Sequence, residues 1–258
     1  MKISVVIHTL NSGKCIRQCL ESVHSFDEII VCDMYSDDDT LSIAEEYGAK
    51  IVMHEPCSGI PEPARVFAVS QATRDWVLVV DSDEVIPEAL KDYLYRTIAS
   101  GNCPDALFLP RKNYFMNRFM RASFPDYQLR FFRKEVFKGW PAVVHSRPEI
   151  DGNIVKAPQK KSLAIIHLED NEIGTRISKI NRYTDRELEK RNTKRENIAG
   201  LLFKPFFRFI VIYFIKGSLF DGKEGLIYAM MQASYKFVMI AKIIERQKGL
   251  SGQSGSGK

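Results

Sequence analysis

Three acidic residues stand directly behind an apolar run in the stretch VLVVDSDEVIP, residues 77–87. Asp81, Asp83 and Glu84 repel one another at this spacing, so a metal ion or an Arg or Lys side chain is expected to compensate their charge. Oxygen ligands at positions i and i+2, with a diphosphate completing the coordination shell, suit Mg²⁺ or Mn²⁺. A capped turn without any ligand is the alternative interpretation.

Other polar residues also come at the ends of apolar runs. Thr9 and Asn11 follow the run at 3–9, and Asp33 follows the run at 28–32. In parallel α/β sheets, ligands bind beyond the carboxyl ends of the strands. The convergence of these residues predicts a binding site at one sheet edge, although Asn11 and Asp33 are also ordinary turn residues.

The first hundred residues alternate between apolar strands and amphipathic helices. Ser12 is expected to cap a helix with apolar residues at 16, 19, 20 and 23, and Gly48 is expected to end a helix that begins near Thr40. A third helix is expected at 63–73, and strands are expected at 3–9, 28–32, 50–54 and 76–80. Strands that alternate with helices form right-handed βαβ units, so the predicted fold is α/β with a mostly parallel central sheet.

Composition excludes several classes of protein. The 258 residues are 45% hydrophobic and 27% charged, which is typical of a globular chain with a full core. No secretory pattern follows Met1, and the five cysteines show neither Cys-x-x-Cys nor zinc-site spacing, so a cytoplasmic location with reduced thiols is expected. Neither G-x-G-x-x-G after the first strand nor G-x-x-x-x-G-K-[ST] occurs, which argues against a dinucleotide fold and a P-loop.

Two long stretches, VVIHTLNSGKCIRQCLESVHSFDEIIVCDMYSDDDT and DWVLVVDSDEVIP, carry a family resemblance. They resemble the nucleotide-sugar domain of family 2 inverting glycosyltransferases, which have the GT-A fold and a D-x-D motif like DSD here. The later stretches DYQLRFFRK, VVHS, KINRYTDREL and GSLFDGKEGLIYA are similar to bacterial β-1,4-glucosyltransferases of the lipopolysaccharide core. The resemblance covers about residues 1–245.

The resemblance implies roles for residues of the donor site. Thr9 and Asn11 would line the nucleotide pocket, Asp33 would meet the uracil or ribose, and Arg65 would lie near the nucleotide or diphosphate. Two departures from the family pattern affect the expected contacts with the nucleobase. Ser12 replaces the family's usual Glu, and residues 34–35 are Met-Tyr where the family has small residues.

The resemblance also implies a bound Mn²⁺ or Mg²⁺. Asp83 would be its principal ligand, with Asp81 beside it. A histidine at the end of a short apolar stretch is expected to supply a third ligand, and His145 is favoured over His167. Hydrogen bonding without metal is the alternative for either imidazole.

Inverting transfer needs a carboxylate that takes the proton of the acceptor hydroxyl. Asp126, in FPDYQLRFF, is the candidate base, and capping of the turn after Pro125 is the alternative. Gln128 and Arg130 would then lie near the diphosphate or the acceptor, unless Arg130 is a surface strand residue. If Asp126 binds the donor instead, Glu149 or Asp151 is expected to be the base.

Charge is distributed unevenly along the chain. Residues 1–100 hold 8 Lys/Arg against 17 Asp/Glu, and the remainder holds 29 against 15. Eight basic residues lie between Arg176 and Arg195, and the run from Phe206 to Ile215 is apolar except for Arg208. This combination favours an interfacial helix on an anionic membrane over a spanning one, because the run is about half of the ~20 residues needed to cross. A helix packed on the core is the alternative.

The sequence as a whole predicts a metal-dependent inverting glycosyltransferase on the inner face of the cytoplasmic membrane. It would transfer a hexose, glucose from UDP-glucose, to a lipopolysaccharide-core or lipid-linked glycan. Its predicted parts are a nucleotide-sugar half (1–110), an acceptor half (111–172), a membrane-proximal helical region (173–248) and a disordered Gly/Ser-rich tail (249–258). A sugar-phosphate nucleotidyltransferase and a non-catalytic module binding membrane or nucleic acid are the alternatives, with no nucleic acid expected.

Overall fold

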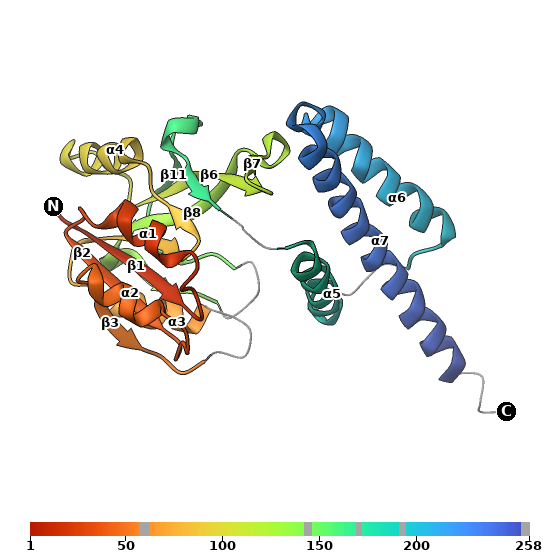
Figure 1. Cartoon of the computed structure of the whole chain (residues 1–258), viewed down its shortest axis with the longest axis horizontal. Coiled ribbons are helices and arrows are strands. Elements are labelled where there is room, and N and C mark those ends of the chain that lie inside the picture. The colour runs from red at the N-terminus through yellow and green to blue at the C-terminus, as the bar shows by residue number, and fades with distance from the viewer. Residues whose placement is uncertain (57–61, 142–145, 169–171, 191–194, 254–258) are drawn as a thin grey trace. The chain divides into compact units, whose positions relative to one another are not determined.

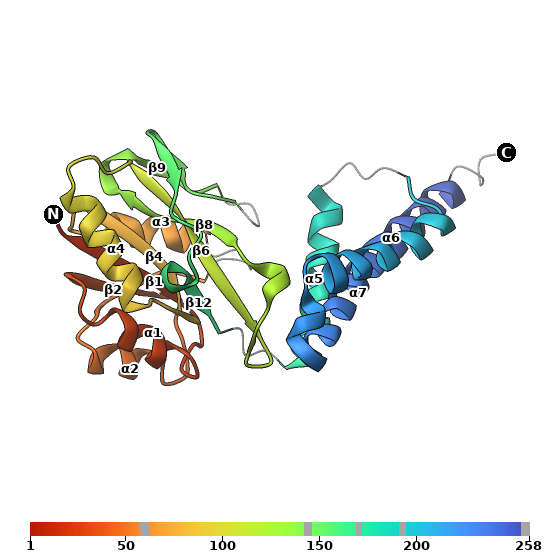
Figure 2. The same ribbon diagram turned by 90° about the horizontal axis from the view of Figure 1, so that it is seen from above.

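The computed structural model describes residues 1–56, 62–141, 146–168, 172–190 and 195–253 (Figures 1 and 2). Two compact units are present. The first contains residues 1–113 and 124–168, and the second contains residues 114–123 and 169–258. Each unit is described by itself below. The predicted division at residues 110 and 172 concerns functional roles and stays a prediction.

The first unit is built on a mixed sheet whose N-terminal half is parallel (Figure 1). Its strands are those expected from the alternating sequence, and in spatial order they are β3 (Lys50–Met53), β2 (Glu28–Asp33), β1 (Ile3–Thr9) and β4 (Trp76–Asp81). In β1 every residue except His8 is buried, because helices cover both faces of the sheet. The predicted α/β class is confirmed, with a parallel set of strands between helices.

The other half of the sheet adds antiparallel pairs. Its strands, continuing from β4, are β8 (Asp126–Arg133), β6 (Ala106–Phe115), β12 (Ile165–His167) and β5 (Glu84–Val85), with β11 (Ile154–Lys156) also on β6. Because β8 runs antiparallel to both β4 and β6, its first residue, Asp126, lies at the edge where β4 ends. β9 (Phe137–Gly139) and β10 (Glu149–Ile150) form a separate pair.

Helices cover the sheet of the first unit on both faces. One face packs on α1 (Ile16–Val23), α2 (Thr40–Glu46) and α4 (Glu88–Ala99), and the opposite face packs on α3 (Glu62–Ser70). Gly48 follows α2 with a φ of 65°, as its predicted place at the helix end requires. The expected cap at Ser12 is wrong: α1 begins after Cys15 without a side-chain cap, and the Ser12 hydroxyl oxygen lies 2.9 Å from that of Ser82.

The second unit is mainly helical. Its elements are β7 (Arg118–Phe119), which pairs with the end of β6, then α5 (Ile173–Lys190), α6 (Ile198–Ile210), the π-helical turn η4 (Val211–Ile215), the 3-10 turn η5 (Ser218–Asp221) and α7 (Gly222–Gln253). Shorter 3-10 turns of the chain are η1 (Arg121–Ser123), η2 (Lys134–Val136) and η3 (Lys161–Leu163). The first residues of the predicted disordered tail belong to α7, and residues 254–258 lie outside the described part.

The stretch GSLFDGKEGLIYA, residues 217–229, contains η5 and the beginning of α7. Asp221 is buried and accepts hydrogen bonds from the backbone N–H of Arg121 (2.9 Å) and from its Nη1 (2.6 Å). A Cβ at Gly225 would lie 1.9 Å from the backbone oxygen of Ser218, so only glycine allows η5 and α7 to approach this closely. The stretch therefore has a structural function within the second unit.

The apolar helix is longer than the sequence suggested. Ile198–Ile215 forms 18 helical residues with a mean hydropathy of 1.9, of which 6% are buried, and it is long and apolar enough to cross a membrane by length and composition. The expected length of about half a span was wrong because it was counted from Phe206, whereas the helix continues through Pro205 from Ile198. The core-helix alternative also disagrees with the exposure of Phe203, Phe206 and Phe207, each of which is more than half exposed.

Candidate active site

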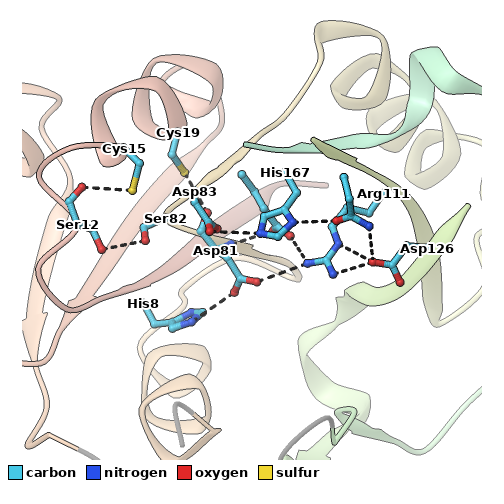
Figure 3. A network of polar contacts seen from close by, with 12 residues as sticks. His8, Ser12, Cys15, Cys19, Asp81, Ser82, Asp83, Arg111, Asp126 and His167 are labelled. Atoms are coloured by element: carbon cyan, nitrogen blue, oxygen red, sulfur yellow. Dashed lines mark hydrogen bonds and ion pairs between the residues drawn. The ribbon is translucent and has the colours of Figure 1, made fainter. Parts of the chain in front are cut away.

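Strand register brings the predicted site residues to one edge of the sheet. In the parallel half, Thr9 is paired with Asp33, and His8 is paired with Asp81. In the antiparallel half, Arg111 of β6 is paired with Asp126 of β8. The short strand β12 places His167 beside Glu84 on one side and Asn113 on the other. Figure 3 shows His8, Asp81, Asp83, Arg111, Asp126 and His167 gathered in one network of polar contacts.

Thr9, Asp33 and Asn11 hold the loop that follows β2. Asp33 is fully buried, and it accepts hydrogen bonds from the hydroxyls of Thr9 (2.7 Å) and Ser36 (2.6 Å) and from the Ser36 backbone N–H (2.7 Å). The Asn11 side-chain oxygen accepts from the backbone N–H of Asp37 (3.0 Å). These contacts agree with the turn role that the sequence left open. The contacts with a nucleotide stay a prediction.

Asp81 lies in a cluster of arginines. Its two carboxylate oxygens accept hydrogen bonds from Arg65 Nη2 (2.7 Å) and from Arg130, and His8 Nε2 lies 3.3 Å away. Burial favours the neutral acid, but the guanidinium groups of Arg130 and Arg65 lower the pKa of Asp81 well below its ordinary value. Arg65 and Arg130, both predicted to bind the donor, therefore converge on the first Asp of the DSD motif.

His8 is neutral at physiological pH in this environment. Burial, together with the positive charge of Arg65, lowers the pKa of His8 to about 3. The Arg65 guanidinium also lies over the ring of Trp140, with its Cζ 4.9 Å from the ring centroid. Arg65 is therefore positioned by a carboxylate on one side and an aromatic ring on the other.

Asp83 faces His167 instead of the arginine cluster. His167 Nε2 lies 3.2 Å from Asp83 Oδ2, and His167 Nδ1 lies 2.8 Å from the side-chain oxygen of Asn113. Nδ1–H can donate to Asn113, and Nε2–H donates to Asp83; burial lowers the pKa of His167, but this hydrogen bond and the negative charge of Asp83 outweigh burial and raise it. The contact with Asn113 fixes the ring so that Nε2, once deprotonated, is available to a cation beside Asp83. Metal-binding histidines are commonly oriented in this way, so the pair of oxygen and nitrogen ligands fits a divalent cation such as Mn²⁺.

Three further observations bear on the metal assignment. His145, the favoured third ligand, lies outside the described residues. Within the described ranges, no group of three His, Cys, Asp or Glu side chains could hold a metal ion. Both oxygens of Asp81 are engaged by arginines, so its direct role as a ligand stays a prediction.

Asp126 is held by donors from two strands. Its Oδ2 accepts from Arg111 Nε (2.9 Å) and Nη2 (2.7 Å) and from Asn113 (3.1 Å), and its Oδ1 accepts from Gln128 (2.8 Å). Burial raises the pKa of Asp126, but the positive charge of Arg111 and these hydrogen bonds outweigh burial and lower it. Asp126 is thus an ionised carboxylate, with 31% of its side chain exposed. Gln128, predicted near the diphosphate or acceptor, contacts this carboxylate.

The sequence analysis missed Arg111 and Asn113, and it named Glu84 only as a charge that needs compensation, without a place in the site. Arg111 and Asn113 are two residues apart on β6, so they point to the same face, and this spacing was the available signal. Glu84 is fully buried and accepts from Arg111 Nη1 (3.0 Å). Nothing in the local sequence indicated that Glu84 turns inward.

Glu149 and Asp151 lie apart from these contacts. Glu149 is on the small β9–β10 sheet and is exposed. Asp151 lies next to it, with its carboxylate 3.3 Å from Lys138 Nζ. The geometry therefore favours Asp126 over either of them as the base.

Comparison with known families identifies the sequence pattern. The model of the family described as Glycosyl transferase family 2 matches residues 4–147. This segment contains the DSD motif, Arg111 and Asp126.

Curated relatives match nearly the whole chain. The lipopolysaccharide core biosynthesis glycosyltransferase LpsC of Rhizobium meliloti (strain 1021) is 27% identical over 95% of this chain and 93% of its own length. An uncharacterized glycosyltransferase of Rickettsia conorii (strain Malish 7) is 29% identical over 95% of this chain and 90% of its own length. Both relatives are therefore similar in length as well as in sequence.

Solved structures share the fold. A mannosyltransferase from Pyrobaculum calidifontis, in complex with GDP-mannose and Mn²⁺, has a TM-score of 0.55 and 14% identity over 94% of this chain and 87% of its own. Residues 1–349 of Staphylococcus aureus TarS give a TM-score of 0.51 and 19% identity over 96% of this chain and 92% of that chain. At these identities the comparison shows the fold alone.

Proposed function

Because this chain belongs to glycosyl transferase family 2 and is therefore a glycosyltransferase, we propose that it transfers a hexose with inversion from a UDP-sugar to a saccharide acceptor. The observation that carries the proposal is the bridge made by Asn113, whose amide contacts both Asp126 and His167. A candidate base and a candidate metal-binding pair are thereby joined at one sheet edge.

Asp126 acts as the general base in this proposal. Its carboxylate is ionised and partly exposed, so it can take the proton from the acceptor hydroxyl. The hydroxyl oxygen then forms the new bond to the anomeric carbon while the bond to the diphosphate oxygen breaks on the opposite face. The leaving diphosphate takes the bonding electron pair.

Asp83 and His167 would hold the divalent cation, with Asp81 beside them. When bound, Mn²⁺ or Mg²⁺ supplies positive charge that stabilises the leaving diphosphate. The Mn²⁺ in the complex of the similarly folded mannosyltransferase supports this assignment. Arg65 and Arg130, within reach of Asp81, add fixed positive charge on the donor side.

The donor is proposed to be UDP-glucose, and Thr9, Asn11 and Asp33 are proposed to form its nucleotide pocket. This choice rests on the resemblance to β-1,4-glucosyltransferases of the lipopolysaccharide core. The acceptor is proposed to be a lipopolysaccharide-core or lipid-linked glycan, which the similarity to LpsC, a lipopolysaccharide core biosynthesis glycosyltransferase, supports.

The enzyme is proposed to work at the inner face of the cytoplasmic membrane. From residue 197 to 220 the chain has no Asp or Glu, while Lys204, Arg208 and Lys216 are exposed. Cationic side chains near an anionic leaflet contribute about 1 kcal/mol each, and exposed aromatic groups add to this. Lys204 and Arg208 in the middle of the apolar helix favour a helix that lies on the membrane over one that crosses it.

Transfer of labelled hexose tests this proposal. UDP-glucose and other UDP-hexoses should be incubated with Mn²⁺ and a panel of lipopolysaccharide-core fragments and lipid-linked saccharides. One donor–acceptor pair should give a product in which the new glycosidic bond has the β configuration when the donor has the α configuration. A product that retains the α configuration would reject the single-displacement mechanism and the role of Asp126 as base.

A further inference from the structure

Arg111 joins acidic groups that come from three strands. Its Nε and Nη2 donate to Oδ2 of Asp126 on β8, and its Nη1 donates to Oε1 of Glu84 on β5. The same Nη1 lies 4.0 Å from Oδ2 of Asp81, at the end of β4. The planar guanidinium has five N–H donors in a fixed arrangement, so these contacts set its orientation as well as its position.

Glu84 connects Arg111 to the DSD loop. Its carboxylate is fully buried, and its Oε2 accepts a hydrogen bond from the backbone N–H of Asp81 (3.0 Å). Its other oxygen accepts from Arg111. A buried carboxylate bound at both oxygens cannot rotate without losing contacts, so it links the backbone of the donor loop rigidly to the guanidinium.

The two oxygens of Asp126 are not equivalent. Oδ2 accepts three hydrogen bonds, two from Arg111 and one from Asn113, whereas Oδ1 accepts one from Gln128. A carboxylate oxygen has about two lone-pair sites, so Oδ2 is saturated and Oδ1 keeps capacity for one further proton donor.

We propose that Arg111, anchored by Glu84, is the positioning residue of the general base. It fixes Asp126 relative to the Asp81–Asp83 loop and directs Oδ1 toward the acceptor hydroxyl. The inference rests on the proposed function, because it takes Asp126 as the base. The proton of the acceptor passes to Oδ1, while the Arg111 protons stay on the guanidinium.

The positive charge of Arg111 has a second consequence for the base. An opposite charge at this distance favours the ionised carboxylate, so the base stays active at lower pH than it would without Arg111. Removing that charge should raise the pKa of Asp126 and move the acid limb of the kcat profile to higher pH. Arg111 is the charged group in direct contact with this carboxylate, and Glu84, Asp81 and His167 are reached through one residue. Asn113 and Gln128 add polar contacts.

Two substitutions of Arg111 separate geometry from charge. Arg111→Lys keeps the charge near buried Glu84 but cannot reproduce the paired Nε and Nη2 bonds to Oδ2 of Asp126, so kcat should fall about 10- to 100-fold with the donor KM little changed. Arg111→Gln also removes the charge, so its acid limb should move upward by about one to three pH units. Lys112→Gln, the adjacent position on the opposite face of β6, is the matched control and should behave as wild type.

The measurement is the pH dependence of kcat for UDP release, with UDP affinity and folding checked for each variant. A merely structural role would lower the amount of folded enzyme without moving the acid limb. If the acid limb does not move in folded Arg111→Gln, the inference is overturned. A wild-type kcat in Arg111→Lys overturns it as well. The Arg111→Lys variant carries the test if Arg111→Gln does not fold. If Asp126→Asn keeps full kcat, the assignment of the base fails instead.

Discussion

At the residue scale, the acidic cluster behind β4 is compensated by arginines. Asp81 forms ion pairs with Arg65 and Arg130, and Glu84 forms an ion pair with Arg111. Two of the three negative charges are therefore paired with residues that lie far away in the sequence. Asp83 is different, because its carboxylate faces an imidazole. The repulsion within the DSD motif is thus relieved by arginine side chains. Because Asp83 faces an imidazole and not an arginine, its carboxylate is the one best suited to bind a cation.

Asp83→Ala should abolish Mn²⁺-dependent UDP binding and hexose transfer while leaving the fold intact. The lost carboxylate supplies the negative charge that would hold the cation against the diphosphate. UDP titration with and without Mn²⁺ measures the effect, and Asp92→Ala, an exposed carboxylate on α4, is the control. Undiminished Mn²⁺-dependent binding in Asp83→Ala would show that the cation is held elsewhere.

Asp126→Asn should lower kcat by about 10²- to 10⁴-fold with donor affinity little changed, since the amide cannot accept the proton. Steady-state kinetics with varied donor concentration gives both quantities. A variant that loses UDP-sugar affinity while keeping kcat would make Asp126 a donor ligand.

The sequence could predict where the acidic residues lie but not their partners. Asp81 and Asp83 have a local signature because they come at the end of an apolar strand, and Asp126 was suggested by its place before a strand and by the family resemblance. Their roles as ligands and base stay predictions. The contact between Arg130 and Asp81 depends on the register of β8 against β4, which joins residues 49 apart in sequence. For the same reason, nothing local distinguished His167, which meets Asp83, from His145.

At the element scale, the parallel strands were predicted and the antiparallel arrangement was not. The strands β1, β2 and β4 are six or seven residues long, and each gives an apolar run that is recognisable by itself. β5 and β12 have two and three residues, too few to show a period, although they carry Glu84 and His167. β6 and β8 are longer, but their pairing joins distant segments, and no local pattern gives its direction or register.

Gly225→Ala should destabilise the second unit, because the added methyl would lie 1.9 Å from the backbone oxygen of Ser218. Overpacking of this kind costs about 1–3 kcal/mol. Gly174→Ala is the matched control, since no atom lies within 4 Å of a Cβ at that position. Thermal unfolding measures both variants, and equal midpoints would contradict the close approach of η5 and α7.

At the scale of the whole molecule, the uneven charge of the sequence has a structural counterpart in the second unit. Its large exposed apolar side chains on α6, η4 and η5 include Leu202, Phe203, Phe206, Phe207, Phe214, Ile215 and Phe220. Single exposed apolar residues are ordinary, but a group of this size on one segment indicates a binding surface. The absence of carboxylates from 197 to 220 supports the proposal that the partner of this surface is an anionic bilayer.

Vesicle flotation tests the membrane proposal. Wild-type protein should bind vesicles that contain anionic lipid, and binding should weaken as salt rises. Phe206→Ser/Phe207→Ser should lose binding, whereas Ile154→Ser/Val155→Ser, which removes exposed apolar groups from β11 in the first unit, should keep it. A wild type that ignores anionic vesicles would reject the membrane proposal. A Phe variant that changes only the oligomeric state would indicate that the surface binds protein instead of lipid.

The measurement that tests the central claim most directly is release of UDP from UDP-glucose by the purified protein, with Mn²⁺ and without acceptor. A glycosyltransferase with this site should hydrolyse the donor slowly, lose the activity in EDTA and regain it when Mn²⁺ is restored. A nucleotidyltransferase would instead release diphosphate from UTP and a sugar 1-phosphate, and a binding module would release nothing. The predicted result is UDP release that depends on Mn²⁺ and on Asp83. Release that persists unchanged in EDTA would contradict the metal-dependent mechanism. Formation of diphosphate from UTP would contradict the assignment as a UDP-hexose transferase.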